Sequence, residues 1–206
     1  MPVAYVIDLL AAVPSVVFGL WGARSLATWL VPAQGWLADH ASFLPFFAGP
    51  VSVTGKTIFT AAIVLAIMIL PIITAISREV FAQTPRLNEE AALALGATRW
   101  EMIRLAVFPY ARSGMVSAVM LGLGRALGET MAVAMVLSAS PVVTLNLISN
   151  TNPATVASNI ASSFSEATPG KLHVLIATGL VLFAVTFAVN FAARWVVGRN
   201  ERRMSR

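Results

Sequence analysis

Cysteine is absent from the 206-residue sequence. Disulfides, thiolate metal sites and cysteine nucleophiles are therefore excluded. The two histidines, His40 and His173, are isolated and have no Glu-x-x-His neighbours, so we expect no metal site. The Gly-x-Ser-x-Gly motif, the His-Glu-x-x-His motif and paired aspartates are missing as well. An intramembrane protease or lipid hydrolase is therefore disfavoured, and we expect no enzyme activity in this chain.

Charged residues are scarce, at 11% of the chain, whereas soluble domains carry about a quarter. Apolar residues make up 58%. A membrane-spanning helix needs roughly 20 mostly apolar residues, and four segments qualify, at about 3–23, 57–76, 112–139 and 172–197. Pro14 and Pro71 interrupt the first and second, and membrane helices tolerate such kinks. We therefore predict an all-α integral membrane protein, with 1–206 as a single transmembrane domain.

The basic residues predict how the chain crosses the bilayer. Most of them lie in the connection between the second and third spans (79–111) and its flanks, or in the C-terminal tail. These are Arg78, Arg86, Arg99, Arg104 and Arg112, and then Arg194, Arg199, Arg202, Arg203 and Arg206. Cytoplasmic segments carry such an excess, so we predict that this connection and both termini are cytoplasmic. The clusters adjoin apolar segments, so we expect a lipid bilayer and no nucleic acid as the partner.

The ends of the first span and the remaining connections carry weaker signals. Met1 opens into apolar sequence without a basic segment, so a removable signal peptide is not expected. Asp8 is interpreted as marking the cytoplasmic boundary. The 24–56 connection, with its tryptophans and prolines, is interpreted as extracytoplasmic. In the 140–171 connection, Asn152 followed by proline predicts a short helix from Pro153 to Phe164.

One segment superficially resembles a nucleotide-binding loop. The stretch 50–57 ends in Gly-Lys-Thr, but Pro50 stands where the first glycine is required and no strand is expected before it. We therefore expect this chain to bind no nucleotide.

The 79–111 connection predicts two short helices joined by a glycine. Thr84 is predicted to cap a helix that begins at Pro85, and Gly96 is predicted to end it in a left-handed conformation. Thr98 and Glu101 have the spacing of a capping box for the second helix, which runs to about Phe108. Proline at 109 then marks the bend into the membrane. The pattern indicates a compact knob, although an ordinary amphipathic loop is the alternative.

Arg125 and Glu129 are predicted to lie inside the third span. An arginine at the bilayer centre costs about 2.5 to 3.5 kcal/mol on insertion scales, so it must face protein or water. The two residues are four apart and are expected to share one helical face. Gly124 and Gly128 beside them form a small-residue ridge suited to close helix contact. Either the pair locks helices together, or both groups line a translocation path for an oxyanion.

The knob resembles the EAA loop of bacterial ABC-importer permeases. The matching residues are Glu90-Ala91-Ala92, then Gly96, then Pro109, although Ala106 and Phe108 stand where the family usually has Ile and Leu. In that family the loop docks into the ATPase subunit, so the resemblance implies a coupling role for this segment. The residues implied are Glu90, Ala91, Ala92, Leu95, Gly96, Trp100 and Pro109. Leu95 and Trp100 are expected to be exposed apolar anchors.

The stretch from Gly122 to Val133 looks like the Arg-Ala-Leu-Gly-Glu-Thr-Met segment of the C-type permeases of phosphate importers. The resemblance implies a type I importer permease fold in a bacterial cytoplasmic membrane. It places Arg125, Glu129, Gly124, Gly128 and Thr130 on the translocation path of inorganic phosphate. The partners it implies are a second permease subunit in a heterodimer, an ATPase homodimer and an extracytoplasmic phosphate-binding protein. ATP and Mg belong to the ATPase, and this chain binds no cofactor.

Two alternatives stay open from the sequence. The chain is a permease for molybdate or sulfate, or a truncated membrane scaffold that transports nothing. The second alternative arises because permeases of this family usually have about six spans. The first two of those spans are expected to be missing from this chain.

Overall fold

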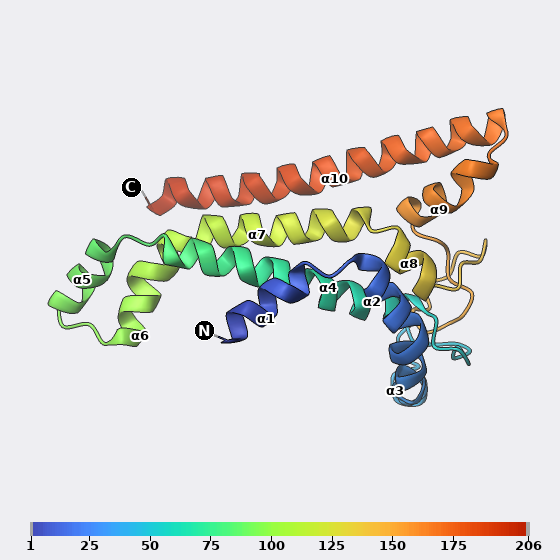
Figure 1. Cartoon of the computed structure of the whole chain (residues 1–206), viewed down its shortest axis with the longest axis horizontal. Helices are drawn as coiled ribbons and strands as arrows, with labels where there is room; N and C mark the ends of the chain where they lie inside the picture. Colours follow the sequence, from blue (N-terminus) through green and yellow to red (C-terminus); the bar gives the residue numbers. More distant parts are fainter. Residues whose placement is uncertain (1, 205–206) are drawn as a thin grey trace. The chain divides into compact units, whose positions relative to one another are not determined.

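The computed structural model describes residues 2–204, with side chains from 4 to 195, and within that range it is helical without a β-strand (Figure 1). Its α-helices are α1 (Pro2–Ala11), α2 (Ser15–Trp21), α3 (Ala27–His40), α4 (Ile58–Ala82), α5 (Arg86–Ala94), α6 (Arg99–Met102), α7 (Phe108–Gly128), α8 (Met131–Val136), α9 (Val156–Ser163) and α10 (Pro169–Met204). Two π-helical turns, η1 (Gly22–Leu26) and η2 (Ile103–Val107), and a 3₁₀ turn, η3 (Phe164–Glu166), complete the set. The all-α prediction is confirmed.

Among the described residues, four helical segments are long and apolar enough to cross a bilayer. They are Ser15–His40, Ile58–Ala82, Arg99–Gly128 and Pro169–Trp195. The chain is therefore a multi-pass membrane protein. Of the tail arginines, Arg206 lies outside the described residues, and only the backbone of Arg199, Arg202 and Arg203 is described.

The first span differs from the prediction at 3–23. Helix α1 ends at Ala11, and a new helix begins at Ser15, after Pro14 in an extended conformation. Proline disfavours the α conformation in the residue before it, so the chain leaves the helix there. From Ser15 the helix continues through α2, η1 and α3 to His40. Much of the 24–56 connection is therefore helical.

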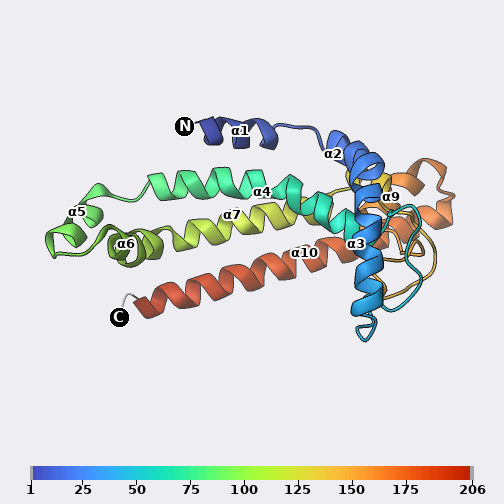
Figure 2. The same cartoon turned by 90° about the horizontal axis from the view of Figure 1, so that it is seen from below.

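The chain forms two compact units, and the first contains residues up to Ala11, Ile69–Arg125 and the chain from Thr186 onward. Within it, the Ile69–Ala82 part of α4 and helix α7 lie side by side (Figure 2). Two glycines permit this approach. A Cβ at Gly122 would lie 2.7 Å from the Ile73 side chain, and one at Gly114 would overlap Val80. Small residues serve such contacts in membranes because they let the backbones come close.

An ion pair ties α1 to α4 in the first unit. A guanidinium nitrogen of Arg78 donates to both carboxylate oxygens of Asp8, at 3.2 and 3.1 Å. Both side chains are 47% exposed, so the pair contributes at most about 1 kcal/mol to stability. Asp8 therefore has a specific partner in addition to the boundary position predicted for it.

The second unit contains Ala12–Met68 and Ala126–Val185. Its core packs α2 and η1 against α8. A Cβ at Gly19 would lie 2.8 Å from the Ala132 Cα, and a Cβ at Gly22 would lie 2.6 Å from Val64. The two helix backbones are thus nearly in contact at Gly19. A buried polar cluster lies in the same unit, where the Gln34 amide donates to the Thr60 hydroxyl at 3.0 Å.

Helix ends in the second half of the chain depart from the predictions for 112–139 and for Pro153–Phe164. Helix α7 ends at Gly128, and α8 begins at Met131 after a break. The prediction that Asn152 and Pro153 start the short helix is wrong, because Thr155 caps it and accepts from the Ser158 N–H. Asn152 is instead fully buried, and its side-chain amide donates to the Ser149 carbonyl.

We predict that Gly19→Val destabilises the protein by about 1 to 3 kcal/mol, the usual cost of overpacking. The atom that the new Cβ would meet is the backbone Cα of Ala132, so no side-chain rotation relieves the clash. Thermal unfolding of the purified protein in detergent measures the effect. Gly35→Ala is the matched control, because a Cβ there has no atom within 4 Å. Equal stability of the two variants would contradict the packing of α2 on α8.

Candidate functional site

The first candidate site is the knob formed by α5 and α6. Helix α5 ends at Ala94, and Gly96 adopts a left-handed conformation with φ 83°. The Gly96 N–H donates to the Leu93 carbonyl at 3.0 Å, and the Ala97 N–H donates to the Ala92 carbonyl at 3.2 Å. These two bonds form a Schellman motif, which closes a helix on glycine. The prediction that Gly96 ends this helix in a left-handed conformation is confirmed.

The start of α5 differs from the prediction. Helix α5 begins at Arg86 with Pro85 as its cap residue, and no side chain caps it. Thr84 was predicted to cap this helix, which is wrong, because its hydroxyl is buried and has no hydrogen-bond partner. The chain at Thr84 is still turning out of α4, since its N–H donates to the Phe81 carbonyl at 3.2 Å.

A capping box fixes the start of α6, as predicted. The Thr98 hydroxyl accepts from the Glu101 N–H at 3.3 Å, and a Glu101 carboxylate oxygen accepts from the Thr98 N–H at 2.8 Å. Each residue thus satisfies a backbone donor of the other. With Gly96 on one side and this box on the other, the turn between α5 and α6 is closed by bonds at both ends.

The sequence predicts that the helix beginning at Arg99 ends at about Phe108, before a bend at Pro109. In the structure the helix does not end there. It passes through the π turn η2 directly into α7, and the Phe108 N–H donates to the Ile103 carbonyl. Proline in a helix clashes with the carbonyl four residues earlier, which here belongs to Leu105 within η2. A wider π turn is a known way to absorb such an irregularity. The knob is therefore continuous with the third candidate span.

Apolar and small side chains of the knob face solvent. Leu95 is 90% exposed and Trp100 is 67% exposed, which confirms their predicted exposure. Glu90 and Ala91 are exposed and Ala92 is half-buried. Exposed aromatic and aliphatic anchors on a closed, capped turn are typical of a protein-docking surface.

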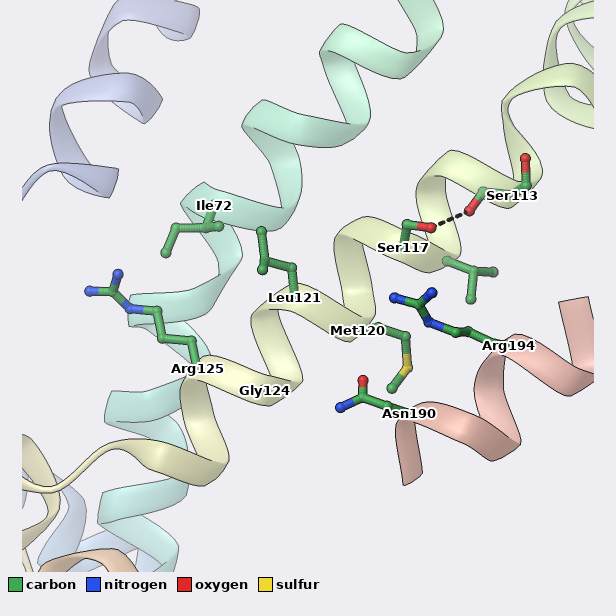
Figure 3. Close-up of a pocket in the computed structure, with 10 residues that line it drawn as sticks. Ile72, Ser113, Ser117, Met120, Leu121, Gly124, Arg125, Asn190 and Arg194 are labelled. Carbon is green, nitrogen blue, oxygen red and sulfur yellow. Dashed lines mark hydrogen bonds between the residues drawn. The ribbon is translucent and has the colours of Figure 1, made fainter. Parts of the chain in front are cut away.

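The second candidate site is a groove of about 810 Å³ within the first unit (Figure 3). It lies among α4, α7 and α10. Its lining residues are Ile72, Ser113, Val116, Ser117, Met120, Leu121, Gly124, Arg125, Asn190 and Arg194. Two of them are arginines and none is acidic. The electrostatic character of the groove is therefore positive.

Arg125 lines this groove from α7. Its side chain is exposed, and among the described residues its guanidinium makes no hydrogen bond or ion pair. Gly124 and Gly128 were predicted to form a ridge for helix contact, but a Cβ added at either position would meet no atom of the described chain within 4 Å. The ridge therefore lies open, while Gly114 and Gly122 make the close helix contact instead.

Glu129 does not lie on the helix that carries Arg125, because α7 ends at Gly128. Its carboxylate accepts from the Ala132 N–H at 3.1 Å, in the first turn of α8. Thr130 occupies the cap position of α8, but its side chain makes no capping bond. The expectation of a shared helical face therefore does not hold. Glycine at 128 favours the break, and the carboxylate satisfies a free N–H beyond it.

Asn190 and Arg194 are among the groove residues that sequence reasoning missed as site candidates. They lie one turn apart on α10 and line the groove together. Arg194 was interpreted only as part of the basic tail. The polar pair at four-residue spacing in an apolar span was the available signal. The place of Arg194 in the groove depends on the packing of helices that lie far apart in the sequence.

Comparison with known proteins assigns the family. The family described as "Binding-protein-dependent transport system inner membrane component" matches residues 2–206. Relatives named phosphate transport system permease protein PstC occur in several bacteria. The Mycobacterium tuberculosis protein PstC 2 is 53% identical over 201 residues, covering 96% of this chain and 61% of that protein. The Xylella fastidiosa PstC is 42% identical over 207 residues, covering 98% of this chain and 63% of that protein.

The chain thus spans 61% to 63% of the length of these relatives. The family match, by contrast, extends over nearly all of its residues. This chain belongs to the family of binding-protein-dependent transport system inner membrane components.

Proposed function

We propose that this chain is part of the transmembrane permease subunit of an ATP-driven importer of inorganic phosphate. The observation that carries the proposal is the identity of 42% to 53% with proteins named phosphate transport system permeases, over nearly the whole chain. The knob and the positive groove support the proposal, because an importer needs a contact to its ATPase and a path for the anion.

The knob is the proposed contact to the ATPase, which is a homodimer. Leu95 and Trp100 present apolar surface to it, and Glu90, Ala91 and Ala92 form the adjoining helix face. Gly96 and Pro109 shape the segment. The chain itself has no nucleotide-binding motif, so ATP and Mg are held by the ATPase. The knob and the C-terminal tail accordingly face the cytoplasm of a bacterial cell, with the N-terminus on the same side.

The groove side of α7 is the proposed translocation path. Arg125 offers planar, permanently charged donors that suit an oxyanion. The open surface at Gly124 and Gly128 suits a second permease subunit, which would complete the path in a heterodimer. Glu129 and Thr130 lie at the break after α7, and a phosphate-binding protein delivers the anion from outside.

Uptake of radiolabelled phosphate tests the proposal. Cells from which the gene has been deleted are compared with cells that carry it, with the partner genes intact. We expect uptake only with the gene present, and no competition from an excess of sulfate or molybdate. Competition by either anion would favour the permease for another oxyanion. Equal uptake in both strains would favour the scaffold that does not transport.

We predict that Glu129→Gln weakens discrimination between phosphate and sulfate. Hydrogen phosphate offers a proton that the carboxylate accepts, whereas sulfate is fully ionised. Glutamine keeps a side-chain oxygen for the Ala132 N–H, so the start of α8 stays capped and only the charge is lost. The ratio of phosphate uptake to sulfate inhibition measures the change. An unchanged ratio would exclude this role for Glu129.

A further inference from the structure

The groove holds two arginines at separate positions. Ser113 and Arg125 both line it from α7, and the interval between them corresponds to about 18 Å at the rise of an α-helix. In the view of Figure 3, Arg194 and Arg125 lie on opposite sides of α7. The two guanidinium groups therefore serve different parts of one groove.

Arg194 has no counter-charge in the described part of the chain. No hydrogen bond or ion pair joins its guanidinium to a described residue, and no acidic residue lines the groove. Arg194 lies on α10 within the candidate span Pro169–Trp195. A cation beside an apolar segment is stabilised by a partner of opposite charge. The geometry leaves that place open to an anion.

Asn190 supplies the second set of donors. It is half-buried and lies one turn before Arg194 on α10, so both side chains line the groove from the same face. The guanidinium offers a planar fork of N–H groups and the amide offers two more. The Ser117 hydroxyl already donates to the Ser113 carbonyl at 3.0 Å, so binding relies on Arg194 and Asn190. Donors without a carboxylate select an oxyanion.

We propose that Arg194 and Asn190 form a binding position for a phosphate-type oxyanion, distinct from the position at Arg125. Two sources share this chemistry, namely free inorganic phosphate and the headgroup of an anionic phospholipid. In the first case the inference rests on the proposed function. The position then serves as a second phosphate-binding site along the path. Passage through a path requires several sites, each weak enough to release the anion. In the second case it anchors lipid against α7 and α10.

The test uses the protein in its complete native assembly, placed in nanodiscs of neutral lipid. The variant is Arg194→Gln, with Arg194→Lys to separate charge from fork geometry. The control is Arg24→Gln, which removes the same charge from an exposed side chain on η1 outside the groove. One arm measures binding of radiolabelled inorganic phosphate. The other measures retention of phosphatidylglycerol by native mass spectrometry.

We expect Arg194→Gln to weaken the binding of one of the two ligands by about tenfold, since hydrogen bonds from charged donors are stronger than those from neutral donors. Arg194→Lys is expected to be intermediate. Weaker binding of phosphate identifies a second phosphate-binding site along the path. Weaker retention of phosphatidylglycerol identifies a site for the lipid headgroup. Unchanged binding in both arms, with Arg24→Gln also unchanged, overturns the inference. Because wild-type uptake is measured separately, that result leaves the proposed function standing.

Discussion

Phosphate uptake is expected to fall about 5-fold to 30-fold when Gly96 is replaced by valine. Gly96 has φ 83°, and a Cβ there would meet no atom within 4 Å. The penalty is therefore one of backbone conformation alone, about 1 to 2 kcal/mol for an L-residue in the left-handed region. That free energy lowers the ratio of the observed turn to its alternative conformations by about 5-fold to 30-fold. The knob would then rarely present Leu95 and Trp100 together.

The matched control is Gly96→Asn, because asparagine tolerates the left-handed conformation better than other non-glycine residues. Its uptake is expected to stay within about threefold of the wild type. Membrane content is measured in parallel by immunoblotting, so that loss of protein is not mistaken for loss of coupling. Equal uptake by the valine and asparagine variants would show that the closed turn plays no part in transport.

Uptake is expected to fall by about 10-fold to 100-fold in Arg125→Gln, because the strongest anion donor on the proposed path is removed. Its guanidinium has no partner among the described residues, so truncation leaves no carboxylate unpaired. Stability should therefore be unchanged. Arg125→Lys keeps the charge but loses the planar fork, and its uptake should be intermediate. Uptake rates at saturating ATP, normalised to membrane content, measure these effects.

A double variant separates transport from helix locking. If Arg125 and Glu129 acted only as an ion pair, Arg125→Gln with Glu129→Gln would remove both charges and recover stability and uptake. The structure gives Glu129 another task, accepting from the Ala132 N–H. We therefore expect the double variant to stay as impaired as Arg125→Gln alone. Recovery of uptake would contradict a direct role for Arg125 on the path.

The knob was predictable because its geometry depends on neighbouring residues. The Thr98 and Glu101 capping box and the left-handed Gly96 follow from spacings of a few positions. One error, Thr84 as a cap, concerns the point where α5 meets the end of α4. There the packing of α4 decided the conformation.

Helix ends inside apolar sequence were less predictable. The break after Gly128 comes at Glu129 and Thr130, inside a segment that the apolar composition predicted as one continuous span. Proline also had different outcomes. The helix breaks before Pro14 but passes through Pro71, which is buried in α4. Whether neighbouring helices compensate for a proline depends on the three-dimensional arrangement.

The groove could not be predicted from the sequence, because it forms only through tertiary contacts. Its residues come from α4, α7 and α10, which lie far apart in the sequence. Arg125 stood out because it carries charge inside a span. Arg194 is one of the basic residues of the tail, so the charge pattern favoured a role in setting the orientation of the chain in the membrane. Only the packing of the first unit brings Arg194 into one groove with Ser117.

Cross-linking from the knob tests the central claim most directly. The 206 residues contain no cysteine, so Leu95→Cys places a single thiol on the knob, where Leu95 is 90% exposed. A photoactivatable maleimide is attached in native membranes, and the products are identified by mass spectrometry. The control is Val143→Cys, 87% exposed in the connection between α8 and α9. The account predicts a covalent product with a P-loop ATPase from position 95 and none from position 143. No ATPase product at 95, or the same product at both positions, would contradict the account.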